Sequence, residues 1–494
     1  MSSRWIFKWK RDQSGNVVKA EARLVAKGFS QVHVQAFFET FAPTLSMSAI
    51  RTLAAFACEN ELPLFHLDAE QAFIQSKLQE EIYLKLPPGC GEWSGKVTQL
   101  RRSLYGLKQA SREWGNLLAS SLKKLNFERC LVDPCIYRLM NGDRVRVIVG
   151  VHVDDMIVVA SNEDCLKLQK KLSKFFPVKH LGVLTWYMGC SFERNGLNGT
   201  LKITQETFAS SLVEKFGISK ESSIPASPSV ELLPRGEDEP QTTEPYREAV
   251  GSLMWLANTT RPDLSQAVRA VARHSHDPGI SHWKAVVKIL SYVASTTDLG
   301  LTYRRGSGKR LSVYVDASFA PRDNERKSVS GGAVLYGKAV VSWFSRSQRC
   351  VALSSTESEY IAASEGIREA LFLRGVIAFI QPNVPEEPIL VFEDNEGAIK
   401  LAENPMSSAR SKHLDTRYHH IRMQCAENVV KLRHVSSDRQ HADILTKPLA
   451  AGPFSYHRNA LMGIKNLFTC LRTGFCFALI LFWLELVFFS CKRD

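Results

Sequence analysis

The chain has 494 residues, of which 45% are hydrophobic and 23% are charged. This composition excludes an intrinsically disordered chain and a small disulfide scaffold, and the length suggests about three domains. Lys and Arg outnumber Asp and Glu by 63 to 50, so the net charge of +13 favours polyanionic partners, nucleic acid first. The 11 cysteines form no paired CxxC units. We therefore expect reduced thiols and a cytoplasmic or nuclear location.

The first 60 residues predict two strands and a helix. Basic and apolar residues alternate in RWIFKWK and EARLVAKGF, whereas SAIRTLAAFACEN has helical spacing. Residues 61–185 contain short apolar strands around isolated acids. The clearest is 145–161, VRVIVGVHVDDMIVVAS, which predicts a β-hairpin with two aspartates at its turn.

Asp154 and Asp155 are the paired aspartates of this hairpin. Adjacent carboxylates at the end of an apolar strand repel each other and lose hydration, and a bound divalent cation such as Mg²⁺ resolves that conflict. The alternative is an ordinary exposed turn rich in Asp. Asp68, in FHLDAEQAFIQ, ends another short apolar stretch and is the candidate third ligand.

A second group of acids follows a Pro-, Ser- and acid-rich linker at 222–245 and a helical region at 246–296. Asp316 lies in the strand pattern LSVYVDASF, and Glu359 opens a helical pattern. Asp394 ends the strand pattern ILVFED, and Asp443 precedes a further helix. Each acid alone is equally compatible with a surface residue or a helix cap.

The C-terminal residues 451–494 have lost the charged, periodic character and are interpreted as a hydrophobic tail. Within it, 474–491 is an apolar run of nearly membrane-spanning length that contains Glu485 and is followed by Lys492 and Arg493. Membrane association is expected, if at all, through this segment alone. The favoured interpretation is additional translated sequence without a selected role.

Ordered motifs over about residues 4–300 resemble the reverse transcriptase of copia-type retrotransposon Pol polyproteins. They include ETFAPTLSMSAIRTL, HLDAEQAFI, EEIYLKLPPG, LRRSLYGLKQASREW and HVDDMIVVAS. The resemblance implies a right-hand polymerase fold of fingers, palm and thumb/connection. It also implies an RNA template, a DNA primer and dNTPs as partners, with Asp68, Asp154 and Asp155 as the ligands of two Mg²⁺ ions.

The resemblance implies roles for five further residues. Phe73 matches the aromatic that crowds a ribose 2′-hydroxyl, although core packing would also explain it. Lys108 and Gln109 match the stretch that lines the nucleotide and template region. Arg23 and Lys27 match the basic strand that neutralises the incoming triphosphate.

The motifs VDAS, SSTESEY, EDNEGAI, KHLDTRYHHIR and HADILTKPL, over about residues 311–450, resemble the ribonuclease H that follows such polymerases. Asp316, Glu359, Asp394 and Asp443 match its four metal-binding acids, and Glu359 is preferred to Glu357 because YIAA follows it. The implied partner is an RNA–DNA hybrid, cleaved with two Mg²⁺ ions. His434 and His441 are candidates for proton transfer or product release, but surface histidine is the favoured interpretation of both.

The expected fold class is therefore α/β and α+β multidomain, a right-hand polymerase followed by a ribonuclease H-like domain. The expected divisions are 1–185 for fingers and palm, 186–305 for thumb/connection, 306–450 for ribonuclease H and 451–494 for the tail. The oligomeric state stays open.

Three positions depart from the family pattern. His152 replaces the usual tyrosine before the paired aspartates, Glu21 replaces a basic residue, and Ser76 replaces a glycine. These departures favour the main alternative, a catalytically inactive remnant that at most binds nucleic acid. A host-adopted, membrane-tethered protein is a third hypothesis, supported by the tail alone.

Overall fold

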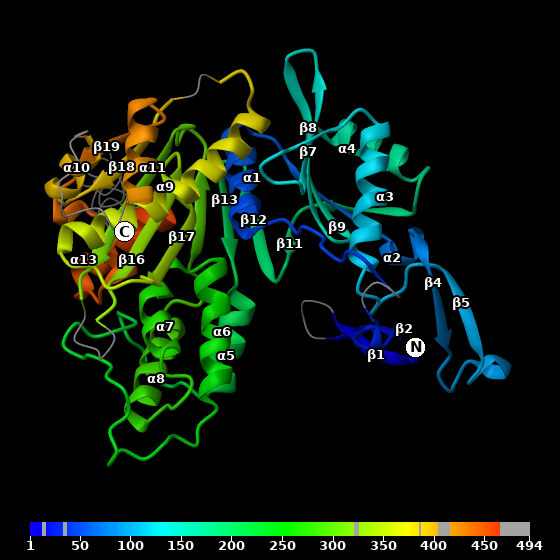
Figure 1. Cartoon of the computed structure of the whole chain (residues 1–494), viewed down its shortest axis with the longest axis horizontal. Coiled ribbons are helices and arrows are strands. Elements are labelled where there is room, and N and C mark those ends of the chain that lie inside the picture. Colours follow the sequence, from blue (N-terminus) through cyan, green and yellow to red (C-terminus); the bar gives the residue numbers. More distant parts are fainter. Residues whose placement is uncertain (12–15, 33–36, 321–325, 385–386, 404–414, 465–494) are drawn as a thin grey trace, which may run out of the picture. The chain divides into compact units, whose positions relative to one another are not determined.

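The computed structural model describes residues 1–11, 16–32, 37–320, 326–384, 387–403 and 415–464 (Figure 1). The chain forms two compact units. The first unit comprises Met1–Leu53, Leu62–Leu184 and Gly375–Pro385, and the second comprises Ala54–Glu61, Thr185–Arg374 and Glu386–Asp494. The division into four domains stays a prediction.

The first unit is built on a six-stranded antiparallel sheet of order β10-β3-β9-β8-β7-β6. Its strands are β3 (Leu64–Ala69), β6 (Glu128–Arg129), β7 (Ile136–Asn141), β8 (Arg144–His152), β9 (Asp155–Val159) and β10 (Val178–Val183). The helices that accompany it are α1 (Met47–Glu59), α2 (Ala72–Gln75), α3 (Ala110–Lys124) and α4 (Asn162–Leu172).

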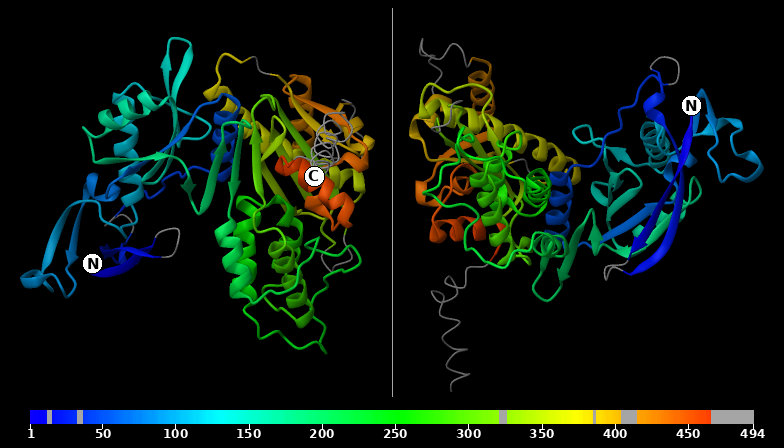
Figure 2. Two further views of the ribbon diagram at one scale, coloured as in Figure 1. Left: turned by 180° about the vertical axis from the view of Figure 1, so that it is seen from behind. Right: turned by 90° about the horizontal axis from the view of Figure 1, so that it is seen from below.

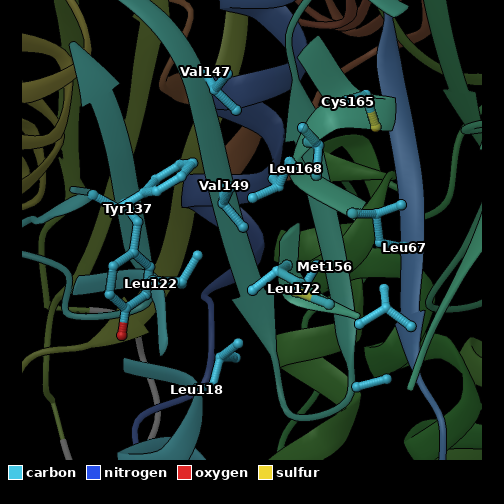
Figure 3. Close-up of a cluster of buried hydrophobic side chains, with 14 of the residues drawn as sticks. Leu67, Leu118, Leu122, Tyr137, Val147, Val149, Met156, Cys165, Leu168 and Leu172 are labelled. Atoms are coloured by element: carbon cyan, nitrogen blue, oxygen red, sulfur yellow. The ribbon is translucent and has the colours of Figure 1, made fainter. Parts of the chain in front are cut away.

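Helices α3 and α4 form the main core with this sheet (Figure 3). The apolar side chains of α3 recur at every fourth residue, which places them on one face of the helix. The buried residues from the two helices are Trp114, Leu118, Leu122, Cys165, Leu168 and Leu172. Val149 faces this core, whereas a Cβ on the next residue, Gly150, would lie 3.0 Å from Leu53 of α1. The sheet is therefore covered on both faces.

Two separate hairpins complete the first unit. They are β1 (Ser3–Arg11) with β2 (Val17–Ala26), and β4 (Lys77–Lys85) with β5 (Val97–Arg102). The strands and the helix expected within the first 60 residues are confirmed. Short 3-10 turns follow at η1 (Gly28–Ser30) and η2 (Gly91–Trp93).

A mixed five-stranded sheet of order β17-β16-β15-β18-β19 organises the second unit (Figure 1). Its strands are β15 (Leu311–Ser318), β16 (Val329–Tyr336), β17 (Ala339–Ser347), β18 (Ile389–Glu393) and β19 (Val430–His434). The accompanying helices are α9 (Ser355–Ile380), α10 (Glu396–Glu403), α11 (Asp415–Ala426), α12 (Asp443–Thr446), α13 (Ala451–Met462) and η5 (Ser437–Arg439). β15–β17 are antiparallel, and β15, β18 and β19 are parallel.

Helices approach both faces of this sheet. A Cβ on Gly366 of α9 would lie 2.4 Å from Val315, so α9 lies against that face. On the opposite face, a Cβ on Gly331 of β16 would lie 2.5 Å from Thr446 of α12. Since successive strand residues alternate between faces, Asp316 shares the face of Gly331, its cross-strand partner.

The helical region of the second unit lies beside this sheet (Figure 2). It contains α5 (Glu206–Lys215), α6 (Tyr246–Thr259), η3 (Pro262–Leu264), α7 (Ser265–Ala272) and α8 (Ile280–Ala294). A four-stranded sheet joins β11 (Trp186–Tyr187), β12 (Cys190–Asn195), β13 (Thr200–Thr204) and β14 (Gly300–Arg304).

A buried ion pair holds this region together. The Arg261 guanidinium donates to the Asp263 carboxylate at 2.9 Å and to the carbonyl of Thr296 at 2.8 Å. The Tyr292 hydroxyl donates to Asp263 at 2.7 Å, and Arg458 of α13 reaches the same hydroxyl at 3.3 Å. Burial acts to raise the pKa of Asp263, but Arg261 outweighs it and the pKa is lowered.

The C-terminal segment differs from the expected tail. Residues Ala451–Met462 form α13, and Phe454, Leu461 and Met462 on it are buried. The helix was missed because its apolar residues are interrupted by Tyr456, His457 and Arg458, two of which have partners inside the fold. The apolar run at 474–491 lies outside the described residues. No helix within the described ranges is long and apolar enough to cross a membrane.

Candidate metal-binding sites

The first acidic site lies where β3 meets the β8–β9 hairpin. His152 pairs with Asp155 across the turn, and Asp68 of β3 pairs with Asp155 from the other side. Neighbouring strands lie about 4.8 Å apart, so this register brings the three predicted aspartates to one end of the sheet. The hairpin with acids at its turn is confirmed.

The turn consists of Val153 and Asp154. Val153 has a φ of 59°, a left-handed conformation that a β-branched residue rarely adopts. Two hydrogen bonds hold it in place. The Trp114 indole donates to the Val153 carbonyl at 2.6 Å, and the Ala69 amide donates to the Asp154 carbonyl at 2.9 Å. The core helix α3 and the strand β3 therefore both fix the position of the paired acids.

Burial and neighbouring charges shift the pKa of Asp154. Burial raises the pKa of its carboxyl, the Asp155 carboxylate raises it further, and Arg23 and His152 act to lower it. Asp155 is instead paired with His66, whose Nε2 lies 2.7 Å from Oδ1. His66 was not singled out from the sequence, although its position two residues before Asp68 places it on the same face of β3.

Tyr105 connects two of the predicted nucleotide-contacting residues to the acids. Its ring meets Phe73 edge-on at 4.7 Å, and the Arg23 guanidinium lies 5.1 Å above it. Burial and then Asp154 raise the pKa of its hydroxyl. Arg23 also pairs with Glu21 at 3.2 Å. Sequence reasoning missed Tyr105, although it lies in the LYGLKQAS motif.

The remaining three predicted contact residues lie elsewhere in the same unit. Gln109 is fully buried and donates to Glu80 at 3.2 Å while accepting from Gln31 at 3.0 Å. The Lys108 ammonium donates to the Gln31 carbonyl at 3.1 Å. Lys27 is half-buried between β2 and η1. These contacts order the loop before α3.

The second acidic site is set by parallel strand register. Tyr314 of β15 pairs with Phe392 of β18, so Asp316 and Asp394 lie level with each other two residues further along. Glu359 enters from the first turns of α9. One carboxylate oxygen from each of the three lies within 4.8 Å of the others, an arrangement that could hold a metal ion.

Asp443, the fourth predicted acid, begins α12 beside this cluster. The Thr446 hydroxyl donates to Asp316, and the Lys447 ammonium lies 2.9 Å from Asp443 Oδ1. Burial, followed by repulsion from Asp316, raises the pKa of Asp443 to about 7. Burial acts to lower the pKa of Lys447, but Asp316 and Asp443 outweigh it and the pKa is raised.

Burial disfavours negative charge on the carboxyl groups of this site. It raises the pKa of Glu359 to about 11, with Asp316, Glu393 and Asp394 adding to the effect. Glu393 is fully buried, and this burial raises the pKa of its carboxyl to about 8. In the described part of the chain, Glu359 and Glu393 each keep one buried oxygen without a hydrogen-bond partner. A hard divalent cation such as Mg²⁺ fits the carboxylates of Asp316, Glu359 and Asp394 and would compensate their charge.

Glu393 was missed because Asp394, the next residue, was assigned as the acid that ends this strand. The signal was available: Glu393 alternates in phase with Ile389 and Val391, both buried on β18. The preference for Glu359 over Glu357 agrees with the geometry. Glu357 instead accepts the Leu353 amide at 2.8 Å at the start of α9.

The surface interpretation of His441 is wrong. Its Nδ1 lies 3.0 Å from Nδ1 of His457, and its ring contacts Tyr314 at 4.7 Å. Burial lowers the pKa of both histidines to about 4. α13 supplies His457, so the error has the same origin as the missed helix. His434 is exposed at the end of β19.

Residues 1–228 match the family model "Reverse transcriptase (RNA-dependent DNA polymerase)". The chain is 36% identical over 467 residues to the retrovirus-related Pol polyprotein from transposon TNT 1-94 of Nicotiana tabacum, covering 92% of this chain and 35% of that protein. It is 30% identical over 309 residues to the putative transposon Ty5-1 protein of Saccharomyces cerevisiae, covering 61% of this chain and 100% of that protein.

Among solved structures, the N-terminal RNase H domain of Rv2228c from Mycobacterium tuberculosis matches 28% of this chain and 91% of that chain. The identity is 14% and the TM-score is 0.22, which is too low to support an argument. The chain spans about a third of the length of the Pol polyprotein from tobacco.

Proposed function

Because the chain belongs to the copia-type retrotransposon Pol polyproteins, we propose that it is an RNA-directed DNA polymerase with a C-terminal ribonuclease H. The observation that carries this proposal is the presence of two acidic sites in two compact units. Each site combines a strand aspartate with acids from neighbouring elements. The proposed partners are an RNA template, a DNA primer, dNTPs and an RNA–DNA hybrid.

At the first site, Asp68, Asp154 and Asp155 would hold Mg²⁺. The bound metal would supply activation of a primer 3′-hydroxyl and stabilisation of the pyrophosphate leaving group. Arg23 would neutralise an incoming triphosphate, a role supported by its position above Tyr105 and by its lowering effect on the pKa of Asp154. Phe73 and Tyr105 would form an aromatic wall against the sugar, with Phe73 crowding a 2′-hydroxyl.

At the second site, Asp316, Glu359, Asp394 and Asp443 would hold Mg²⁺, which would direct water at an RNA phosphodiester. Glu393 would not reach the substrate, since its side chain is fully buried, and its raised pKa keeps it largely protonated at neutral pH until a cation binds nearby. Thr446 orients Asp316 through its hydroxyl. Lys447 lies beside Asp443 and is placed to attract the phosphate.

The polymerase is tested by dNTP incorporation on a primed RNA template with Mg²⁺, using the purified full chain. We expect extension by the wild type and its loss, by a hundredfold or more in order of magnitude, in Asp154→Asn. The control is Asp164→Asn, a half-buried aspartate on α4 that pairs with Arg146 at 2.5 Å and lies outside the acidic site. Equal extension by the wild type and Asp154→Asn would refute the polymerase proposal and favour the inactive remnant.

The nuclease is tested separately on a labelled RNA–DNA hybrid. We expect cleavage by the wild type, loss in Asp394→Asn, and retention in Glu357→Gln, because Glu357 is bonded to the Leu353 amide instead of the metal cluster. If Asp394→Asn cuts as fast as the wild type, the assignment of the second site is wrong.

A further inference from the structure

A cavity of about 760 Å³ lies in the second unit, beside the second acidic site. Its walls are the linker at 225–232, helices α7 and α8, and the end of β15. Thr446 and Lys447 also line it. The same two residues contact Asp316 and Asp443, so the cavity adjoins the acid cluster without containing it.

Basic side chains dominate the charge of this cavity. Arg269 and Arg273 lie one helical turn apart at α7, and Lys284 and Lys288 lie one turn apart on α8. Like charges at this spacing destabilise a helix, so the Lys284–Lys288 pair facing this space favours an anionic occupant. Among the described lining residues, the acid that opposes them is Glu231.

The remaining lining is apolar and includes an exposed aromatic ring. Ala267, Ala270 and Ile289 form part of the helical wall. Phe319, 43% exposed, lies three residues beyond Asp316 at the end of β15. Exposed aromatic rings combined with basic side chains are the combination on which unpaired bases stack while their phosphates are neutralised.

The size of the cavity restricts the occupant. A volume of this order falls within the range of about 300–1,000 Å³ that small-molecule sites occupy. It can admit a short single strand but not a duplex. Together with the basic and aromatic lining, this size favours an occupant that carries phosphates and unpaired bases beside the acid cluster.

We propose that this cavity holds a short single-stranded segment of nucleic acid next to the scissile phosphate. Phe319 stacks on a base, and Lys284 and Lys288 of α8 bind the phosphates. The proposal rests on the proposed nuclease function and adds a substrate preference to it: hybrids that end in a single-stranded overhang bind more tightly than blunt hybrids.

The test compares blunt hybrids with hybrids carrying a short RNA or DNA overhang. Binding to the full chain is measured by fluorescence anisotropy in EDTA, so that cleavage does not occur. We expect the overhang to tighten binding about tenfold in the wild type. Phe319→Ala and the double variant Lys284→Gln/Lys288→Gln should each remove most of that gain and leave binding of the blunt hybrid almost unchanged.

The matched control is Lys220→Gln/Lys338→Gln, which removes the same charge outside the cavity. In the cavity variant alone, the slope of log K against log salt for the overhang hybrid should fall by about 1.4. Thermal melts verify folding, and the single variant Lys284→Gln, at an exposed position, substitutes for the double variant if that unfolds.

Equal binding of blunt and overhang hybrids by the wild type would overturn the proposal. So would equal loss of the overhang gain in the cavity and control variants. Because binding is measured without Mg²⁺, a chain that prefers overhangs but does not cut would refute the nuclease and leave the cavity assignment intact. A gain confined to either the RNA or the DNA overhang identifies the strand that occupies the cavity.

Discussion

Raised carboxyl pKa values make the stability of the second unit depend on pH. The groups concerned are Glu359, Glu393 and Asp443. Burial raises the pKa of each above its ordinary value, to about 11, 8 and 7 respectively. The folded chain therefore retains protons on these groups that the unfolded chain has already released. Stability that depends on this protonation is complete below the ordinary carboxyl pKa and is lost as pH rises through the folded values.

We predict that, without divalent cations, the melting temperature of the second unit decreases as the pH rises from 5 to 8. Mg²⁺ should raise the melting temperature more at pH 8 than at pH 5, because a bound cation compensates the carboxylates that have lost protons. Scanning calorimetry at both pH values with and without Mg²⁺ measures this. Asp443→Asn should flatten the pH dependence, and a Mg²⁺ effect that is equal at both pH values would contradict the prediction.

Elements are positioned by close backbone approaches that side chains would block. Gly106 has a φ of +91°, and a Cβ there would lie 2.1 Å from the carbonyl of Ala26 at the end of β2. This contact places β2, which carries Arg23, against the loop that carries Tyr105. The geometry of the first acidic site thus depends on a glycine outside it.

Gly106→Ala should lower stability by about 1–3 kcal/mol and reduce dNTP incorporation, because both the left-handed backbone and the close approach are lost. Urea denaturation and primer extension measure the two effects. The control is Gly115→Ala in α3, where a Cβ meets open space and the substitution should be neutral or slightly stabilising. Equal behaviour of the two variants would show that the approach at Gly106 has no structural role.

The buried ion pair of the helical region gives a second prediction at this scale. Asp263→Asn leaves Arg261 buried without a counter-charge and should cost about 3–5 kcal/mol. Asp277→Asn breaks the partly exposed pair with Arg235 and should cost about 1 kcal/mol or less. Comparable losses in the two variants, measured by urea denaturation, would contradict this ranking.

Sequence reasoning predicted best the elements whose period and chemistry agree. The hairpin around Asp154, the strand around Asp316 and the helix after Glu359 show apolar runs interrupted by acids. It failed where tertiary contacts decide the structure. Strand pairing brings His66 to Asp155, and α13 brings His457 against His441. Neither pairing has a local signature.

At the scale of the whole molecule, the two acidic sites belong to different compact units. Each unit has its own sheet, and the carboxylates of one site contribute nothing to the named causes of the pKa shifts at the other. We infer that the two sites can lose function separately.

The prediction is reciprocal. Asp154→Asn should abolish incorporation and leave hybrid cleavage within about twofold of the wild type, whereas Asp394→Asn should do the reverse. Both assays on both variants form the measurement, and circular dichroism confirms folding. Loss of both activities in either folded variant would show that the sites are coupled.

The left-handed backbone at Val153 bears on the evolutionary history of such a chain. Holding a β-branched residue there costs about 1–3 kcal/mol, and Gly or Asn would relieve much of that cost. A copy released from selection would gain stability by either replacement. The strain at Val153 is therefore a cost to stability that one substitution at this turn would largely remove.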